Sequence, residues 1–172
     1  MLSVLDDSLL CVLISCEENL NSYRIPYYMY IYQTLGFNFK FRFKLSYNGL
    51  VSYGLNSYLD ELISSDYISD TNGVLTLTSK SISIFNTLIF TAEELDYIKS
   101  LIYVLDSMTD EDLVFLALTA LALKEVEQKY GVEGLVLSKG YVEELLTKLT
   151  NNFSKENLCK SIKILKLYKR EV

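Results

Sequence analysis

The sequence predicts a mainly α protein with a small β-sheet (α+β class), and three neighbouring segments carry this prediction. Residues 37–47 alternate aromatic and polar side chains, which is the two-residue period of a strand. Residues 50–64 place leucines at helical spacing. Residues 67–78 form two short strand-like runs around Asp70-Thr71-Asn72-Gly73, where Asn-Gly favours a tight reversal. Helical segments followed by strand, helix and hairpin indicate a winged helix.

The chain has 172 residues, of which 50% are hydrophobic and 22% charged, as is typical of a globular protein. We expect a winged-helix-like domain at residues 1–90 and a helical bundle at residues 91–172 packed on it, or one continuous domain. No apolar run approaches the roughly 18 residues that span a bilayer. The start, Met1–Asp7, lacks the basic segment of a signal peptide. A cytoplasmic protein without membrane contact is therefore expected.

Signals for catalysis and metal binding are weak. The chain has no histidine, and its three cysteines, Cys11, Cys16 and Cys159, lack the spacing of a zinc site. Gly-x-Ser-x-Gly, a phosphate-binding Gly-rich loop and His-Glu-x-x-His do not occur in the sequence. We therefore predict no metal, no cofactor and no enzymatic activity, with a serine or tyrosine nucleophile as the remaining alternative.

Two N-terminal helices are predicted, at residues 3–16 and 23–35. The second has Pro26 in its first turn and Leu35-Gly36 as its stop. It also carries a cluster of tyrosines, which are Tyr23, Tyr27, Tyr28, Tyr30 and Tyr32. We expect these rings to form core and rim, with hydroxyls reaching water; stacking on bases or lining a partner groove is the alternative.

The strand predicted at residues 37–47 has an apolar face of phenylalanines and a cationic face. The cationic face carries Lys40, Arg42 and Lys44. These side chains contact phosphates in one interpretation and form a solvated edge that discourages strand pairing in the other. In a DNA-reading winged helix, the next helix enters the major groove. However, no lysine or arginine occurs between Leu45 and Ser79, which disfavours guanine recognition.

The C-terminal half is predicted to form four helices, at residues 92–106, 110–130, 135–150 and 154–170. Thr91 with Glu94, and Thr109 with Asp112, match capping boxes at the first two starts. The start of the 110–130 helix is apolar almost all round, which indicates a buried position or a homodimer interface. Gly131-Val132-Glu133-Gly134 is expected to break the chain between the second and third of these helices.

The last predicted helix is the strongest cationic feature. Residues 151–172 carry six basic and two acidic side chains, in a chain whose net charge is −6. The basic residues of this helix are Lys160, Lys163, Lys166, Lys169 and Arg170. An amphipathic basic helix binds nucleic acid or an acidic partner in one interpretation. In the other, it is a solvated face whose cations suit a helix C-terminus.

Residues 47–52, Tyr-Asn-Gly-Leu-Val-Ser, begin a motif that continues through the helix at residues 55–62 to Tyr67-Ile68. With the predicted helix Arg24–Gly36 before it and Leu113–Thr119 after it, this motif resembles the YwgA and SocA-like antitoxin group, also called Panacea, over residues 1–125. The resemblance implies a non-enzymatic regulatory or antitoxin-like module with no catalytic residue to carry over. The candidate partner contacts in this region are Tyr47, Asn48, Tyr53 and Asn56.

Two functions fit these observations. The first is a winged-helix regulator, antitoxin-like or transcriptional, that binds DNA through the Lys40, Arg42 and Lys44 face or through the 160–170 helix. The second is a protein–protein interaction module, such as a subunit, adaptor or inhibitor of a defence or mobile-element system, with no nucleic-acid binding. The acidic net charge and the cation-free helix favour the second, and the two basic faces favour the first. A partner protein is the expectation in either case.

Overall fold

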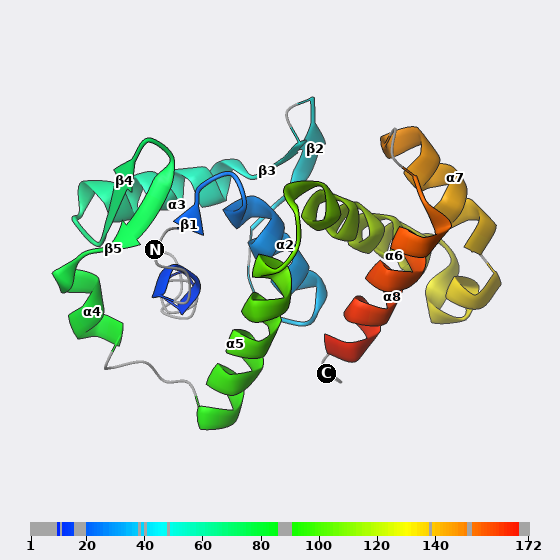
Figure 1. Cartoon of the computed structure of the whole chain (residues 1–172). Coiled ribbons are helices and arrows are strands. Elements are labelled where there is room, and N and C mark those ends of the chain that lie inside the picture. The colour runs from blue at the N-terminus through cyan, green and yellow to red at the C-terminus, as the bar shows by residue number, and fades with distance from the viewer. Residues whose placement is uncertain are drawn as a thin grey trace. The chain divides into compact units, whose positions relative to one another are not determined.

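The computed structural model describes residues 10, 12–15, 20–37, 39, 41–47, 49–85, 91–137, 139–150 and 153–168. No side chain is described at residues 84, 85, 130–137 and 139. The protein is mainly helical with short antiparallel strands (Figure 1), so the predicted α+β class is confirmed. Among the described residues, no helix has both the length and the apolar character needed to cross a membrane.

Two compact units make up the chain. The first comprises Met1–Tyr28 and Phe39–Ser107, and the second comprises Met29–Asn38 and Met108–Val172. Helix α2, Ile25–Thr34, begins in the first unit and ends in the second. The domain boundary expected near residue 90 stays a prediction.

The first unit holds all the described strands. Leu10 and residues 12–15 are helical, within the helix predicted at residues 3–16. The further elements are β1 (Leu20–Asn21), the start of α2, β2 (Lys44–Ser46), β3 (Gly49–Val51), α3 (Tyr53–Ser64), β4 (Ile68–Thr71), β5 (Val74–Leu77), α4 (Ser79–Phe85) and α5 (Ala92–Asp106). One antiparallel sheet has the order β1-β5-β4, with Leu20 opposite Leu75 (Figure 1). β2 and β3 form a second sheet of two strands.

The hairpin of β4 and β5 forms as the sequence predicts. Asn72 and Gly73 connect the strands with φ angles of 57° and 82°, and a two-residue hairpin turn of type I′ needs positive φ at both positions. The Gly73 N–H also donates to Asp70 Oδ1 over 2.7 Å. Local turn chemistry therefore sets the register of this hairpin.

Helix α2 ends where Leu35-Gly36 predicts. Gly36 has a φ of 103°, and the N–H of Phe37 donates to the carbonyl of Tyr32 over 3.2 Å. The rings of Tyr32 and Phe37 meet edge to face with centroids 5.1 Å apart. A left-handed glycine, a hydrogen bond across it and an apolar contact together form a Schellman stop.

The tyrosines of α2 are core and rim residues. Tyr27, Tyr28, Tyr30 and Tyr32 are buried, and Tyr23, just before the helix, is 46% exposed. Within the first unit, Tyr28 Oη donates to Asp106 Oδ1 over 2.6 Å, and Arg24 donates to the carbonyl of Leu105 over 2.9 Å. These bonds join the start of α2 to the end of α5. The expected place of these rings in core and rim is confirmed, and the four buried rings cannot stack on bases. The expectation that the hydroxyls reach water is wrong for Tyr30, whose hydroxyl is buried.

The hydroxyl of Ser52 caps helix α3. Ser52 is buried with an extended backbone, and its Oγ accepts a hydrogen bond from the Leu55 N–H over 3.4 Å. Ser52→Ala is expected to lower the free energy of unfolding by about 1 kcal/mol, because that N–H loses its acceptor. Urea unfolding of both proteins measures the change. Ser57→Ala, an exposed serine on the same helix, is the control, and an equal loss in both variants would contradict a capping role.

The second unit is a group of helices around one core. It contains the end of α2, α6 (Asp110–Leu137), α7 (Lys139–Leu149) and α8 (Lys155–Tyr168). α6 packs on both α7 and α8 (Figure 1). Seven buried residues form the core between them, which are Phe115, Leu118, Ala122, Val126, Val142, Leu146 and Leu158.

The helix starts in the C-terminal half follow their predicted caps, but one predicted break is wrong. Thr91 and Glu94 form a complete capping box at α5, and the Asp112 N–H donates to Thr109 Oγ1 over 3.2 Å. The helix expected to stop at Gly131–Gly134 continues to Leu137, and the next starts at Lys139 rather than Leu135. A helical glycine costs only about 1 kcal/mol relative to alanine, so two glycines need not end a helix of this length.

Burial of Tyr30 makes the free energy of unfolding depend on pH in the alkaline range. Burial raises the pKa of the Tyr30 hydroxyl from 10.0 to about 12, against a smaller lowering by the Thr34 hydroxyl, and Glu125 adds to the rise. In the unfolded chain tyrosine ionises near 10. The unfolded state therefore loses this proton first, so the stabilisation is complete below about pH 10 and is lost as pH rises through about 12.

Tyr30→Phe is expected to flatten the fall in stability between about pH 10 and 12. The wild-type free energy of unfolding should fall more steeply than that of the variant, by up to about 1.4 kcal/mol per pH unit, since up to one proton is released on unfolding. Urea unfolding at several pH values in this range measures both slopes. Parallel slopes would show that the Tyr30 hydroxyl is not the group responsible.

Candidate partner-binding site

The β2–β3 hairpin carries several of the residues predicted to contact a partner. Ser46 pairs with Gly49 beside the turn, and Lys44 pairs with Val51 at the open end. Gly49 has a φ of 100°, and a Cβ there would overlap the hydroxyl of Tyr27. The hairpin was not predicted, although Asn48-Gly49 is a turn dipeptide like Asn72-Gly73. Its position differs, because Gly49 is already paired with Ser46 and the loop comprises positions 47 and 48.

The strand predicted at residues 37–47 is much shorter in the structure. Only Lys44–Ser46 is a strand, because its partner β3 has three residues and Ser52 is already the cap of α3. The predicted apolar face is buried in part without strand pairing: Phe37, Phe39 and Phe41 are buried. The last two members of that face depart from the prediction, since Phe43 is half-buried and Leu45 is exposed. Phe41 lies against Tyr58 of α3, with ring centroids 6.2 Å apart.

The cations predicted on this segment are free to meet a partner where they are described. Arg42 and Lys44 are exposed, and neither forms an ion pair with another described residue. Tyr47, in the turn, is fully exposed, and Leu45, which lies between Lys44 and Tyr47 in the sequence, is also exposed. Lys40 and Asn48 lie outside the described residues. The hairpin therefore presents a small cationic, aromatic and apolar surface.

The exposed side of α3 and the β4–β5 turn are acidic. Tyr53 and Asn56 are exposed on α3, as expected of partner contacts. The exposed carboxylates that follow are Asp60, Glu61, Asp66 and Asp70. The next cation along the chain, Lys80, is engaged locally: its Nζ donates to the carbonyl of Ser65 over 2.6 Å and lies 4.2 Å from the ring centroid of Tyr67. This surface therefore combines an exposed ring with negative charge.

The basic helix α8 belongs to the second unit. Leu158, Ser161 and Leu165 form its buried face. Its exposed face carries the three predicted lysines, Lys160, Lys163 and Lys166. None of these three forms an ion pair with a described residue. Lys169 and Arg170 lie outside the described residues.

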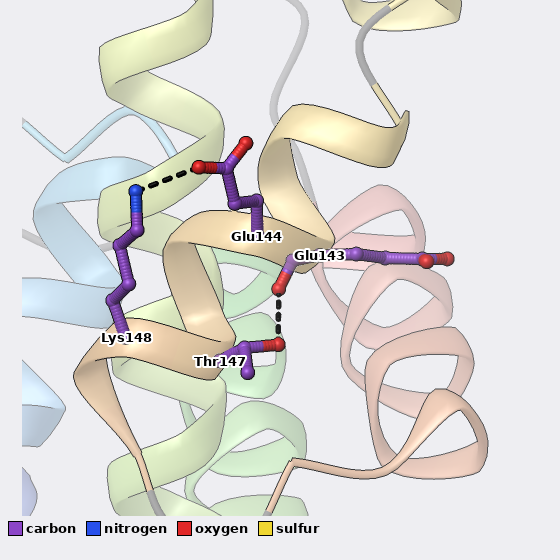
Figure 2. A network of polar contacts seen from close by, with 4 residues as sticks. All are labelled: Glu143, Glu144, Thr147 and Lys148. Atoms are coloured by element: carbon purple, nitrogen blue, oxygen red, sulfur yellow. Dashed lines mark hydrogen bonds and ion pairs between the residues drawn. The ribbon is translucent and has the colours of Figure 1, made fainter.

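Two glutamates of helix α7 form ion pairs with lysines of the second unit that lie outside the predicted basic set (Figure 2). Glu144 accepts a hydrogen bond from Lys148 over 2.6 Å, which lowers the pKa of Glu144 and raises the pKa of Lys148. Glu143 points to the other side of the helix, where its carboxylate lies 3.9 Å from Lys155 Nζ at the start of α8. Both pairs are on the surface, so each contributes little stability. Lys148 and Lys155 are therefore paired with carboxylates, whereas the lysines further along α8 have no ion-pair partner among the described residues.

A small hollow lies between α6 and α8. Its lining residues are Met108, Asp112, Phe115, Asn157, Lys160, Ser161 and Ile164. It has room for about one water molecule, which is far below the volume of a substrate site. Within the described ranges, no three His, Cys, Asp or Glu side chains gather as metal ligands would. This hollow is therefore too small to be a candidate substrate site.

The two cationic groups predicted from the sequence belong to different units. Arg42 and Lys44 are in the first, and the lysines of α8 are in the second. Tyr47 and Tyr53 are exposed in the first unit, in the β2–β3 turn and, after β3, at the start of α3. No protein-family model matches the chain, and no curated protein or solved structure matches it either. The resemblance to the YwgA and SocA-like group stays a prediction.

Proposed function

We propose that this chain is a non-enzymatic winged-helix regulatory protein, antitoxin-like, that acts by binding a protein partner. In chain order, the elements are the helix at residues 12–15, strand β1, helices α2 and α3, and the β4–β5 hairpin. Strands β2 and β3 lie between α2 and α3. The hairpin strand β5 pairs with the first strand, β1. This order supports the winged-helix assignment for the first unit.

The acidic surface of α3 is the observation that favours a protein partner over duplex DNA. A winged helix that reads DNA inserts this helix into the major groove, beside phosphates that repel carboxylates. Here Asp60 and Glu61 lie on the exposed side of the helix, and Asp70 lies at the hairpin turn. Tyr53 and Tyr47 instead supply the exposed aromatic rings that are enriched in protein interfaces.

Site-specific photocrosslinking in cells of the source organism tests this proposal. A photoreactive phenylalanine analogue replaces Tyr47, Tyr53 or, as a matched control, Tyr103, which is 78% exposed compared with 79% for Tyr53. Discrete protein adducts are expected at Tyr47 and Tyr53 but not at Tyr103. Equal or absent adducts at all three positions would reject a partner site on this surface.

DNA binding through α8 is the second candidate function. The exposed and unpaired lysines Lys160, Lys163 and Lys166 favour it, because each phosphate contact releases counterions. Fluorescence anisotropy with a random-sequence duplex, across a salt series, measures such binding. This candidate requires affinity that falls with salt and is lost in the Lys160→Glu, Lys163→Glu, Lys166→Glu variant. No measurable binding by wild type would reject it.

A further inference from the structure

We infer that the edge of the β2–β3 hairpin binds an acidic peptide segment of the partner in extended form. The inference rests on the proposed function and specifies the chemistry of the partner. It follows from three properties of the hairpin: an open strand edge, unpaired cations and an exposed apolar and aromatic tip.

The open edge belongs to β2. Among the described residues, β2 is paired on one side only, by β3, and all three of its residues are exposed. In an antiparallel pair, alternate residues turn their backbone N–H and C=O groups away from the neighbouring strand. An added strand satisfies these groups, as in peptide recognition by strand addition.

Charge selects which peptide can add to this edge. No acidic residue occurs between Glu18 and Asp60, although the chain as a whole has a net charge of −6. Lys44 on β2 and Arg42, two residues before it, are exposed and have no ion-pair partner among the described residues. Lysines on an edge strand disfavour pairing with neutral or basic strands. The same charges complement Asp and Glu at alternate positions of an incoming segment.

The tip of the hairpin offers apolar contacts that would strengthen binding of the peptide beyond what charge pairing supplies. Tyr47 is fully exposed in the turn and Leu45 is 43% exposed on β2. Exposed ion pairs contribute only about 0.2–1 kcal/mol each, so a tight complex needs apolar contacts as well. A tyrosine provides such contact at low entropic cost, because its side chain has two χ angles. The preferred segment is therefore acidic and also contains apolar residues.

Nucleic acid fits this surface less well. The first unit places Asp60 and Glu61 on α3, which directly follows β3 along the chain. These carboxylates repel a phosphate backbone, which carries a charge at every nucleotide, more strongly than a peptide whose acidic residues alternate with apolar ones. The unpaired lysines of α8 lie in the other unit.

Selection from a displayed library of random short peptides on the full chain tests the inference. Peptides rich in Asp and Glu are expected to be enriched on wild type. Arg42→Glu with Lys44→Glu should abolish that preference and weaken binding of the best acidic peptide by about tenfold or more. The matched control, Lys99→Glu with Lys155→Glu at two exposed positions, changes the net charge equally and should leave selection unchanged. Arg42→Gln with Lys44→Gln repeats the test without new negative charge if the reversed variant does not fold.

Backbone N-methylation of the best peptide tests the strand-like binding mode. Methylation at alternate residues should weaken binding by about fivefold to tenfold, and methylation at the intervening residues should not, because a strand edge uses every second amide. A uniform or absent effect overturns strand addition. Enrichment that is not acidic, or that is equal on both charge-reversed variants, overturns the charge complementarity. Displacement of the peptide by a single-stranded oligonucleotide, with salt-dependent binding lost on reversing Arg42 and Lys44, overturns it in favour of nucleic acid.

The crosslinking result separates this inference from the proposed function. Protein adducts at Tyr47 without any acidic preference in the peptide selection would overturn the inference while leaving the protein partner in place. The absence of specific adducts at both Tyr47 and Tyr53 would remove the proposed function itself.

Discussion

Leu146→Ala is expected to lower the free energy of unfolding by about 2–5 kcal/mol. Leu146 lies on α7 with no exposed surface, within the core that also contains Phe115 and Leu158. Removing its side chain loses the transfer free energy of the buried methyl and methylene groups and leaves a cavity between three helices. Because whole domains are stable by only about 5–15 kcal/mol, a loss of this size is a large fraction of the total.

Urea unfolding followed by circular dichroism measures the loss. The control is Leu167→Ala, which removes the same side chain from α8 where it is 78% exposed, and it should change stability by less than about 0.5 kcal/mol. Hydrogen exchange adds a second readout, because opening of the core should expose amides of α7 and α8 first. Equal effects of the two substitutions would contradict the helix packing described for the second unit.

Elements whose causes are local could be predicted from the sequence. Asn72-Gly73 specifies a turn by its own backbone preferences, Leu35-Gly36 ends α2, and Thr91 with Glu94 starts α5. Each depends on residues within one turn of the chain. The two-residue alternation also correctly predicted the burial of Phe37, Phe39 and Phe41, since burial of one face needs no knowledge of the pairing partner. It failed at the end of the same face, where Phe43 is only half-buried and Leu45 is exposed.

Elements that depend on distant residues could not be predicted in this way. The strand expected at residues 37–47 is limited to Lys44–Ser46 by the length of β3, and β1 exists only because β5 lies beside it. Gly131 and Gly134 have low helix propensity, yet α6 continues past them to Leu137. For β1 and β2 the pairing strand, and not local propensity, decides the outcome.

The candidate site shows the same division. Exposure of Arg42 and Lys44 followed from the alternation, and exposure of Lys160, Lys163 and Lys166 followed from helical spacing. The sequence did not predict that β2 has an open edge or that Tyr47 occupies a turn, because both depend on the missed hairpin. The Asn48-Gly49 dipeptide was the available signal for that hairpin.

Gly49→Ala is expected to lower the free energy of unfolding by about 2–4 kcal/mol. Two effects combine at this position. The φ of 100° is strained for any residue with a Cβ, and the added methyl would overlap the hydroxyl of Tyr27, whose ring is buried. The matched control is Gly140→Ala on α7, where nothing lies within 4 Å of an added Cβ, and it should stabilise the protein by up to about 1 kcal/mol.

A double-mutant cycle with Tyr27→Phe separates the two effects of Gly49→Ala. Phenylalanine removes the hydroxyl, and the nearest remaining ring atom, Cζ, would lie 3.5 Å from the new methyl, which is an ordinary contact. Gly49→Ala should therefore cost only about 1–2 kcal/mol in the Tyr27→Phe background, because the strain in φ remains and the overlap does not. Urea unfolding of the four proteins measures the coupling. Additive costs would mean that Gly49 is required for its backbone angle alone, and that the β2–β3 hairpin does not depend on close approach to Tyr27.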